Sequence, residues 1–506
     1  MKVLMINWDN YPNVASGGVY SWEKFLVEGM RGIRFSILNQ LSNSNVSAKY
    51  EVPDYVENVM AIPLFGTNRL EEFSSVNDKF SERMRRTTQS VISNEFIPIF
   101  RRFIENILSK DCNFESTADS IYELHKFLVE HDVKKCFENS KTWEVYLEYL
   151  RSNPDFATMH LIEALNAFRT FQRGLQIISF EMPKVDLVHC SLAWFPSFAA
   201  ICEKRKYGCP VVVTEHGVAY REQLLNFNLQ LNEEVDLKFW KRLAHNIIMT
   251  VYHEANAIVP VCASNAVWEI MMGVAQSKIS VIYNGIDTNR FKPFEVKRVS
   301  DRPTVVSIAR IDVWKDIPGL IHAINIVRED IPNVVCQLYG EAIDLDYAKR
   351  CQSLVKDLHL EENFKFMGRT AQPEVAYNSG DLVVFTGITE GFPFSVIEAM
   401  ACGKPLVAAN VGGVGEALEG CGLLVQSLSP RDLANKIIQL LRDEQLRKKL
   451  GYLALQRARE RFSIEASNGK YRRLYDSLVP LGESSSKNSI APPTKLLAQA
   501  VRSDSN

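Results

Sequence analysis

Two glutamates with seven residues between them are the clearest chemical signal in the sequence. Glu390 precedes the turn Gly391-Phe392-Pro393, and Glu398 lies in the apolar run after that turn. An unpaired carboxylate among apolar neighbours is costly, so Glu398 requires hydrogen-bond donors. The hydroxyl groups of a sugar are such donors, which indicates a site for a hydroxyl-rich ligand. The alternative is that Glu390 only begins a helix and Glu398 is a surface acid.

A strand-to-helix junction must position this pair. The apolar run 381–386 predicts a buried strand, and the Gly-x-Pro after it predicts a turn. We expect a short helix from about Phe394 to Gly403, because Pro405 blocks its continuation. Its first amides point back toward the strand end, where the helix dipole favours an anion such as a diphosphate.

Two cations follow another predicted strand. Arg310 and Lys315 come directly after the apolar run 305–309. Cations at a strand end can neutralise a diphosphate leaving group. A solvated loop with surface charges is an equally open explanation.

Three further features lie at predicted strand ends or turns. The Gly17-Gly18 turn lets backbone amides approach a ligand, although glycines in such a turn are more often only geometric. His216 ends a predicted strand and precedes Gly217, and this coincidence favours a functional over a structural histidine. The turn 284–287 is interpreted as structural, near a hinge.

The composition is that of a globular chain with two or more domains: 506 residues, 46% apolar and 23% charged. The 58 basic and 60 acidic side chains give a net charge of -2, which offers no general attraction to nucleic acid or to an anionic membrane. No run approaches the roughly 18 apolar residues of a membrane span, and the start of the chain suits a strand rather than a signal peptide. We therefore expect a cytoplasmic protein. The ten cysteines form no C-x-x-C pair and are expected to be buried thiols.

Both halves of the chain alternate strand-like and helical segments. Such alternation predicts parallel sheets with helices on both faces, here two Rossmann-like, doubly wound α/β domains facing a cleft. A mostly helical insertion in the first domain is expected at about 41–182. The predicted strands are 2–7, 35–39, 185–189 and 210–214 in the first half, and 304–309, 334–339, 363–367, 381–385 and 405–409 in the second.

Taken in order, these pieces resemble the retaining glycosyltransferases of family 4, which have the GT-B architecture. The resemblance covers about residues 1–40 and 183–480, and the run 390–405 is its most specific part. Within that family the chain looks closest to the PelF-like branch, which builds bacterial exopolysaccharide. The matching segments are 17–22, 185–189, 214–222, 284–287, Arg310 with Lys315, 390–405 and 411–416.

The resemblance implies a division of the chain into two domains and two terminal segments. Residues 1–297 form an acceptor-side domain and residues 298–462 a nucleotide-sugar domain, with a charged connector near their boundary. A helix at 463–481 returns to the first domain. The tail 482–506 is rich in Ser, Pro and Asn and is expected to be disordered.

The resemblance also implies roles for the candidate residues. Glu398 holds the ribose hydroxyls of the nucleotide, while Glu390 holds a hydroxyl of the donor sugar and faces the reacting carbon. Arg310 and Lys315 stabilise the departing diphosphate, where charge develops in the transition state. His216 lies near the sugar and the acceptor and completes the catalytic set. The other donor-binding positions are Gly17, Gly18, Gly391, Phe392, Pro393, Phe394 and Ser395 for the diphosphate and sugar, and Gly340, Met367, Gly368 and Arg369 for the base.

No metal and no other cofactor are expected. Metal-dependent transferases usually show a carboxylate pair that holds a divalent ion against the diphosphate, and two cationic side chains can replace that ion. Asp344-Leu345-Asp346 has the spacing of such a pair, but it lies in a polar segment that suits a helix start. Arg310 and Lys315 therefore favour metal-independent transfer.

The predicted reaction moves a hexose from a nucleotide sugar, UDP-glucose by resemblance, to a growing glycan or other hydroxyl acceptor, with retention at the anomeric carbon. The helical insertion is a candidate contact for a membrane-embedded export partner, which would hold the chain at the inner face of the membrane. No nucleic-acid partner is expected. Two alternatives stay open: a non-catalytic nucleotide-sugar-binding subunit, and a nucleotide-sugar epimerase of related fold. A dinucleotide oxidoreductase is disfavoured, because no Gly-x-Gly-x-x-Gly follows the first strand.

Overall fold

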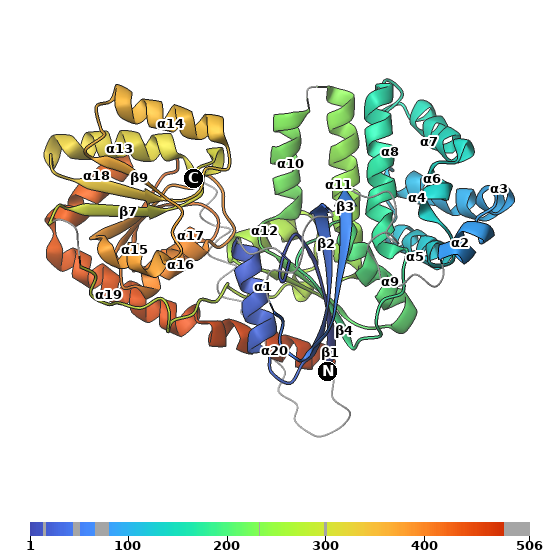
Figure 1. The fold of residues 1–506 in the computed structure, drawn as a ribbon, viewed down its shortest axis with the longest axis horizontal. Helices are drawn as coiled ribbons and strands as arrows, with labels where there is room; N and C mark the ends of the chain where they lie inside the picture. Colours follow the sequence, from blue (N-terminus) through green and yellow to red (C-terminus); the bar gives the residue numbers. More distant parts are fainter. Residues whose placement is uncertain (14–16, 44–50, 66–79, 232, 298–300, 480–506) are drawn as a thin grey trace. The chain divides into compact units, whose positions relative to one another are not determined.

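The computed structural model describes residues 1–13, 17–43, 51–65, 80–231, 233–297 and 301–479. These residues form two compact units, each built around one parallel six-stranded sheet (Figure 1). The first unit comprises 1–260, 268–280 and the segment that starts at Arg472, and the second comprises 261–267 and 281–471. The predicted α/β architecture with two doubly wound sheets is confirmed.

The sheet of the first unit has the order β3-β2-β1-β4-β5-β6, and all neighbouring strands are parallel. The chain passes outward from β1 to β3 and then returns to the other side of β1, so the order reverses between β1 and β4. Open α/β sheets bind ligands at the carboxyl ends of strands beside such a reversal. The strands are β1 (Lys2–Trp8), β2 (Arg34–Asn43), β3 (Val56–Phe65), β4 (Leu187–Cys190), β5 (Val211–Glu215) and β6 (Ala257–Pro260).

The sheet of the second unit has the order β12-β11-β10-β7-β8-β9, again with parallel neighbours. Here the order reverses between β7 and β10, whose residues Val305 and Leu382 are paired. The carboxyl ends of these two strands are therefore the expected ligand position of this unit. The strands are β7 (Thr304–Ile308), β8 (Val335–Tyr339), β9 (Phe364–Gly368), β10 (Leu382–Phe385), β11 (Leu406–Ala409) and β12 (Leu423–Val425).

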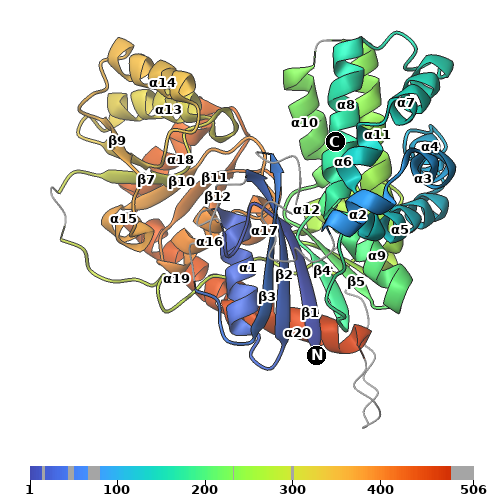
Figure 2. The ribbon, with the colours of Figure 1, turned by 45° about the vertical axis from the view of Figure 1, so that its right-hand side comes forward.

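The helices between β3 and β4 form a bundle that shares one core with the first sheet (Figure 2). Phe96, Phe100 and Phe103 are fully buried in that core. The helices up to β4 are α1 (Gly18–Gly29), α2 (Phe80–Arg86), α3 (Gln89–Val91), the π-helix Ile92–Phe96, α4 (Ile97–Ile107), α5 (Phe114–Glu130), α6 (Val133–Phe137), α7 (Ser140–Ser152), α8 (Leu161–Leu175) and the 3₁₀ turn Gln176–Ile178. Those after β4 are the 3₁₀ turn Phe195–Ser197, α9 (Phe198–Tyr207), α10 (Ala219–Gln230), α11 (Glu234–Glu254), α12 (Ala263–Met271) and the 3₁₀ turn Gln276–Lys278.

Helices cover both faces of the second sheet. The side chains of α13, α14 and α18 share a core with one face, and those of α15, α16 and α17 share a core with the other (Figure 1). The alternation of strand and helix requires this two-sided cover. The helices are the 3₁₀ turn Val313–Lys315, α13 (Ile317–Asp330), α14 (Leu345–Asp357), α15 (Pro373–Ser379), α16 (Phe394–Ala401), α17 (Val414–Leu418), α18 (Pro430–Arg442), α19 (Glu444–Arg461) and α20 (Ile464–Leu478).

Three strands correct the sequence-based assignment. β3 lies inside the segment predicted to be helical, and its residues Glu57, Asn58 and Val59 are exposed at the edge of the sheet. An edge strand lacks the continuous apolar run that marks a central parallel strand, which explains the error. β6 and β12, of four and three residues, were not predicted.

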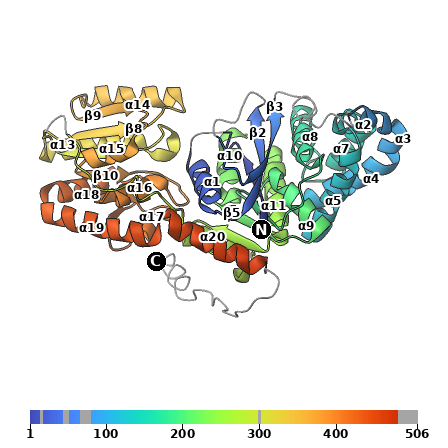
Figure 3. The ribbon, with the colours of Figure 1, turned by 60° about the horizontal axis from the view of Figure 1, so that its bottom comes forward.

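The units divide earlier than the predicted boundary between 297 and 298. Ile286 bridges to Ser463, and Phe291 is buried in the core of the second unit, so the connector from Val281 belongs there. Helix α20 is shared: the second unit ends at Tyr471, and the part that follows lies beside the first sheet (Figure 3). The predicted tail 482–506 lies outside the described residues.

Two smaller predictions concern membrane spans and cysteines. In the part of the chain that the structure describes, no helix has both the length and the apolar character needed to cross a membrane. All ten cysteines are free thiols, and all except Cys112 are buried. The expectation of buried thiols is thus confirmed with that one partly exposed exception.

Candidate functional site

The carboxyl edge of the second sheet brings together the predicted cations and the first glutamate. Arg310 and Lys315 follow β7, and Glu390 follows β10, the strand paired with β7. The Thr386 hydroxyl donates to the Lys315 carbonyl at 2.7 Å, and the Ile388 amide donates to the Trp314 carbonyl at 2.8 Å. These bonds join the two loops, so that the residues meet where the strand order reverses.

Lys315 and Glu390 form a direct ion pair, with Nζ of the lysine against Oε1 of the glutamate. Their side chains are only 15% and 18% exposed. Burial lowers the pKa of Lys315 to about 8, and the nearby positive charge of Arg310 acts in the same direction. A buried ammonium group next to a second cation is suited to bind an additional anion.

Arg310 is the more accessible cation, with a side chain that is 62% exposed. Its Nε lies 3.2 Å from Oδ2 of Asp312, which in turn accepts a hydrogen bond from the Trp314 amide at Oδ1. Only the arginine side of this ion pair is exposed, because the Asp312 side chain is 11% exposed. The exposed guanidinium can contact a phosphate from the solvent side.

Glu398 lies on α16 and accepts a hydrogen bond from the Tyr377 hydroxyl at 2.9 Å. Burial raises the pKa of Glu398 to about 7, although the Tyr377 bond and the charge of Arg290 oppose the shift. Arg290 itself pairs with Glu374 at 2.9 Å. Among the described residues the Glu398 carboxylate accepts one hydrogen bond, from Tyr377, whereas an ionised carboxylate can accept about four.

The turn between the two glutamates is held by residues distant in the sequence. The Asn284 side-chain amide donates to the Phe392 carbonyl at 2.9 Å, and the Gly413 amide donates to the Gly391 carbonyl at 2.7 Å. Gly412 has φ +51°, and a β-carbon on it would lie 1.9 Å from the Glu390 carbonyl oxygen. The turn 284–287 was interpreted as structural, and Asn284 helps to position the glutamate turn through this hydrogen bond.

Helix α16 begins at Phe394 with Pro393 as its N-cap residue, close to the prediction. It ends at Ala401, and Gly403 with φ +69° follows, as expected for a glycine that terminates a helix. The amides of Phe394 and Ser395 belong to the first turn, whose amides have no acceptors within the helix. They are available to an anion beside Glu390.

The predicted base-binding positions lie farther along the same edge. The Gly340 amide donates to the Gly368 carbonyl at 2.9 Å, and a β-carbon on Gly340 would lie 1.8 Å from the Ala309 carbonyl oxygen. Met367 is 45% exposed, and Arg369 lies 3.9 Å from Glu341. The loops after β7, β8 and β9 are thereby packed together, which leaves Met367 and Arg369 accessible to a ligand.

Gly17, Gly18 and His216 belong to the first unit. Gly17 precedes α1 with φ +112°, and its missing side chain leaves open space. The His216 ring lies 4.5 Å from the Trp22 ring, and burial lowers the pKa of His216 to about 3. The imidazole is therefore neutral at physiological pH.

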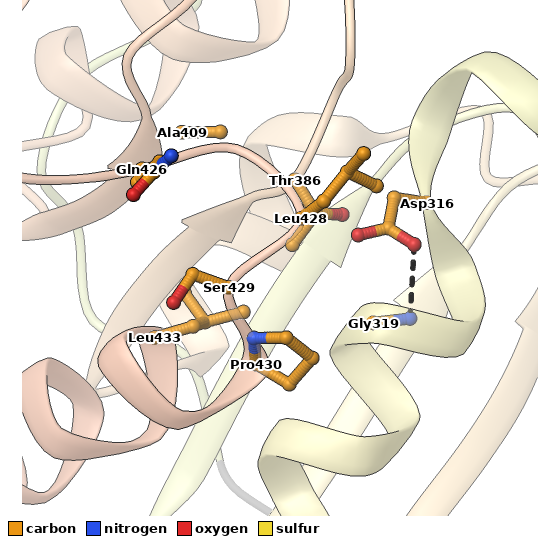
Figure 4. A pocket seen from close by; sticks show the side chains of 9 residues that line it. All are labelled: Asp316, Gly319, Thr386, Ala409, Gln426, Leu428, Ser429, Pro430 and Leu433. Atoms are coloured by element: carbon orange, nitrogen blue, oxygen red, sulfur yellow. Dashed lines mark hydrogen bonds between the residues drawn. The ribbon is translucent and has the colours of Figure 1, made fainter.

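A small pocket adjoins the Lys315 loop at the same edge of the second sheet (Figure 4). Asp316, with φ +45°, caps α13 by accepting from the Gly319 amide at 3.1 Å. Thr386, which bonds to the Lys315 carbonyl, also lines the pocket. None of the residues predicted to form the site lines it. The remaining lining residues are Ala409, Gln426, Leu428, Ser429, Pro430 and Leu433.

The Asp-x-Asp segment is a helix start, as predicted. Asp344 caps α14 by accepting from the amides of Asp346 and Tyr347 at 3.0 and 2.9 Å. Across the described residues, the one group of three potential metal ligands is Glu115, His253 and Glu254 in the first unit, and Arg205 pairs with both glutamates at 2.9 Å. The expectation of a metal-independent reaction stays a prediction.

Two family models match the chain. Residues 1–277, more than half of the chain, match the family described as Domain of unknown function (DUF3492). Residues 288–457 match the family described as Glycosyl transferases group 1.

The chain is also similar to individual relatives in sequence and to solved structures in fold. The uncharacterized glycosyltransferase MJ1178 of Methanocaldococcus jannaschii is 25% identical over 361 residues, 69% of this chain and 93% of that protein. The crystal structure of HepE from Anabaena with UDP and glucose has a TM-score of 0.58 at 18% identity, covering 94% of this chain and all of that one (100%). Sucrose-phosphate synthase from Thermosynechococcus elongatus has a TM-score of 0.60 at 16% identity, covering 94% of this chain and 99% of that one. At such identities the two structures show the fold alone.

The family matches and the arrangement of the second sheet agree on one class of protein. The two parallel sheets and their covering helices are those of the GT-B glycosyltransferases that use nucleotide-sugar donors. The chain belongs to the family described as Domain of unknown function (DUF3492), and its residues 288–457 match the family described as Glycosyl transferases group 1.

Proposed function

We propose that this glycosyltransferase moves a hexose from UDP-glucose to a growing glycan, without a metal ion and with retention at the anomeric carbon. The observation that supports it most is the contact of Lys315 with Glu390 at the carboxyl edge where the second sheet reverses its order. The exopolysaccharide role, a cytoplasmic location and a membrane-embedded partner for the helical bundle are parts of the proposal that rest on the resemblance.

In the proposed reaction, the bond between the anomeric carbon and the diphosphate oxygen breaks, and that oxygen keeps the electron pair. The acceptor oxygen forms the new bond to the same carbon, and its proton passes to the departing diphosphate oxygen. Lys315 and Arg310 stabilise the charge that develops on the leaving diphosphate, as preorganised cations do. Because two cations are at hand, no divalent ion is needed for this charge.

The Lys315–Glu390 pair links donor binding to sugar binding in this proposal. A diphosphate that draws the ammonium group of Lys315 toward itself weakens the contact with Glu390. Glu390 then becomes free to accept a hydrogen bond from a sugar hydroxyl. Donor binding thereby prepares the carboxylate that faces the reacting carbon.

Glu398 is the proposed partner of the ribose. Its carboxyl group lies on the same strand-to-helix segment as Glu390 and receives one hydrogen bond, from Tyr377. Two ribose hydroxyls would occupy further acceptor positions of the carboxylate. They would also favour its ionised form and so oppose the raised pKa.

Incubation with single nucleotide sugars tests the proposal. Release of nucleoside diphosphate is measured with and without EDTA, for the unchanged chain, Glu390→Ala and Glu390→Gln. Glu419→Gln is the matched control, because Glu419 is an exposed acid of the same unit that pairs with Arg457 at 2.8 Å. We expect release from UDP-glucose, no effect of EDTA, and loss of release in both Glu390 variants only.

Other outcomes identify the alternatives. Nucleotide-sugar binding without release would indicate a non-catalytic subunit. Formation of a new sugar nucleotide without free diphosphate would indicate an epimerase. Release that stops in EDTA would contradict the metal-independent reaction, and release from a different donor alone would correct the choice of UDP-glucose.

A further inference from the structure

Four rings form a continuous row in the first unit, from α20 to the segment after β5. Tyr475, His189, Trp22 and His216 follow one another with centroid distances of 5.6, 5.4 and 4.5 Å. The interplanar angles are 87°, 87° and 71°, so each contact is edge-on, an arrangement in which aromatic rings attract one another. The row connects His216 with the carboxy-terminal helix.

His189 is the centre of this row. It is fully buried on β4, its Nδ1 lies 2.5 Å from the Tyr475 hydroxyl, and its Nε2 lies 2.7 Å from the Thr214 hydroxyl. Burial lowers the pKa of His189 to about 3, so the ring is neutral, with one nitrogen donating and the other accepting. Thr214 stands two residues before His216, so His189 fixes the end of β5 as well as the Trp22 ring.

The His216 ring is in contact with Trp22. Its Nε2 is buried and has no hydrogen-bond partner among the described residues. The titratable groups around it are His189 beyond Trp22 and the acids Glu215 and Glu222 of its own segment, whose pKa values are both raised by burial. The edge-on contact with Trp22 therefore restrains the imidazole.

We propose that Trp22, His189 and Tyr475 are positioning residues for His216, and that α20 is thereby a working part of the acceptor side of the enzyme. Trp22 touches the His216 ring directly, whereas His189 and Tyr475 act through Trp22 and Thr214. The inference rests on the proposed function, because that function places His216 near the sugar and the acceptor. It adds that the carboxy-terminal helix contributes to transfer and not only to folding.

The first test uses Tyr475→Phe, which keeps the ring edge and removes the hydroxyl from His189. We expect kcat for transfer to the acceptor to fall about fivefold to tenfold, the effect of one lost hydrogen bond, while KM for the donor stays within about twofold. Tyr146→Phe is the matched control, because Tyr146 is equally buried in the first unit and its ring contacts Trp143, Phe168 and Phe171. It should leave kcat within about twofold of the unchanged enzyme.

The second test uses Trp22→Phe, which replaces the indole ring over His216 with a smaller ring, and Trp22→Ala, which removes the ring. Water then reaches the imidazole, and its pKa should rise toward the ordinary value of about 6.5. The transfer rate of the variants should then fall as the pH drops below about 6.5, whereas the unchanged enzyme should show no such fall. General damage to the fold would instead lower the rate by the same factor at every pH.

A direct titration of His216 by NMR with ¹⁵N-labelled histidine separates this inference from the proposed function. If the unchanged enzyme turns over no donor, the proposed function is wrong. A raised His216 pKa in Trp22→Phe would still support the positioning of His216 by Trp22. If Trp22→Phe leaves the His216 pKa unchanged, or Tyr475→Phe behaves like Tyr146→Phe, the inference is wrong.

Discussion

Replacing Glu398 with glutamine should change both the strength and the pH dependence of nucleotide binding. The substitution keeps the shape of the side chain and the hydrogen bond from Tyr377, and it removes only the charge. If ribose hydroxyls bind the carboxylate, Glu398→Gln must bind UDP less tightly than the unchanged enzyme at pH 8. At pH 6 the difference between the two should be about tenfold smaller than at pH 8.

The size of the effect follows from the pKa of Glu398, which burial raises from 4.5 to about 7. At about 1.4 kcal/mol per pH unit, the ionised form is disfavoured by about 3 kcal/mol relative to water. When only the ionised form binds ribose, affinity falls about tenfold between pH 8 and pH 6. A hydrogen bond to a charged group contributes about 1.5–3 kcal/mol, so Glu398→Gln should weaken UDP binding about 10- to 100-fold at pH 8.

Calorimetric titration with UDP, in two buffers of different ionisation enthalpy, measures both the affinity and the protons released. The titration of UDP itself is common to both proteins and cancels in the difference. Tyr377→Phe is the companion variant: it removes the one internal donor, so the pKa of Glu398 should rise further and the pH dependence should move upward. Equal UDP affinity of Glu398→Gln and the unchanged enzyme at pH 8, or a difference that does not vary with pH, would refute the assignment.

Three further predictions concern other parts of the chain. Lys315→Ala should lower kcat about 10²- to 10³-fold in the diphosphate-release assay with little change in melting temperature, whereas equal kcat would exclude Lys315 from leaving-group stabilisation. Gly412→Ala should reduce stability by about 1–3 kcal/mol and displace Glu390, because its β-carbon would strike the Glu390 carbonyl. Gly420→Ala is the control, because Gly420 also has a positive φ, +73°, but has open space around its β-carbon position. Chemical unfolding of both variants separates backbone strain from the clash. Equal losses of stability would contradict a contribution from the clash. Glu269 is fully buried, and burial raises its pKa from 4.5 to about 9. Between these pH values the folded chain retains a proton that the unfolded chain releases. The stability of the fold therefore decreases as the pH rises from about 4.5 to about 9. Glu269→Gln should therefore gain stability relative to the unchanged chain from pH 5 to pH 9 in thermal unfolding, and parallel curves would show that Glu269 does not cause the loss.

Much of the second unit was predictable because its signals are local. The apolar runs of β7 and β10 and the turn before α16 each lie within a few residues of Arg310 or Glu390. Parallel strands bring their carboxyl ends to one edge, so the neighbourhood of these residues follows from recognising the strands. The ion pair of Lys315 with Glu390 fits that expectation.

The supporting contacts could not be predicted, because they join distant positions. Asn284 reaches Phe392 across 108 residues, and Tyr377 reaches Glu398 from another helix. Nothing in the types of Asn284 or Tyr377 distinguishes these contacts from an ordinary turn or a buried tyrosine. In the first unit, β3 escaped prediction because its exposed edge residues have the polarity of a loop.

A crystal structure with UDP-glucose or its nonhydrolysable analogue tests the central claim most directly. We predict that the ribose hydroxyls contact Glu398, that the diphosphate contacts Arg310, Lys315 and the first amides of α16, and that a sugar hydroxyl contacts Glu390. A nucleotide seated in the pocket beside Asp316, or one that leaves Lys315 and Glu398 without contact, would contradict it.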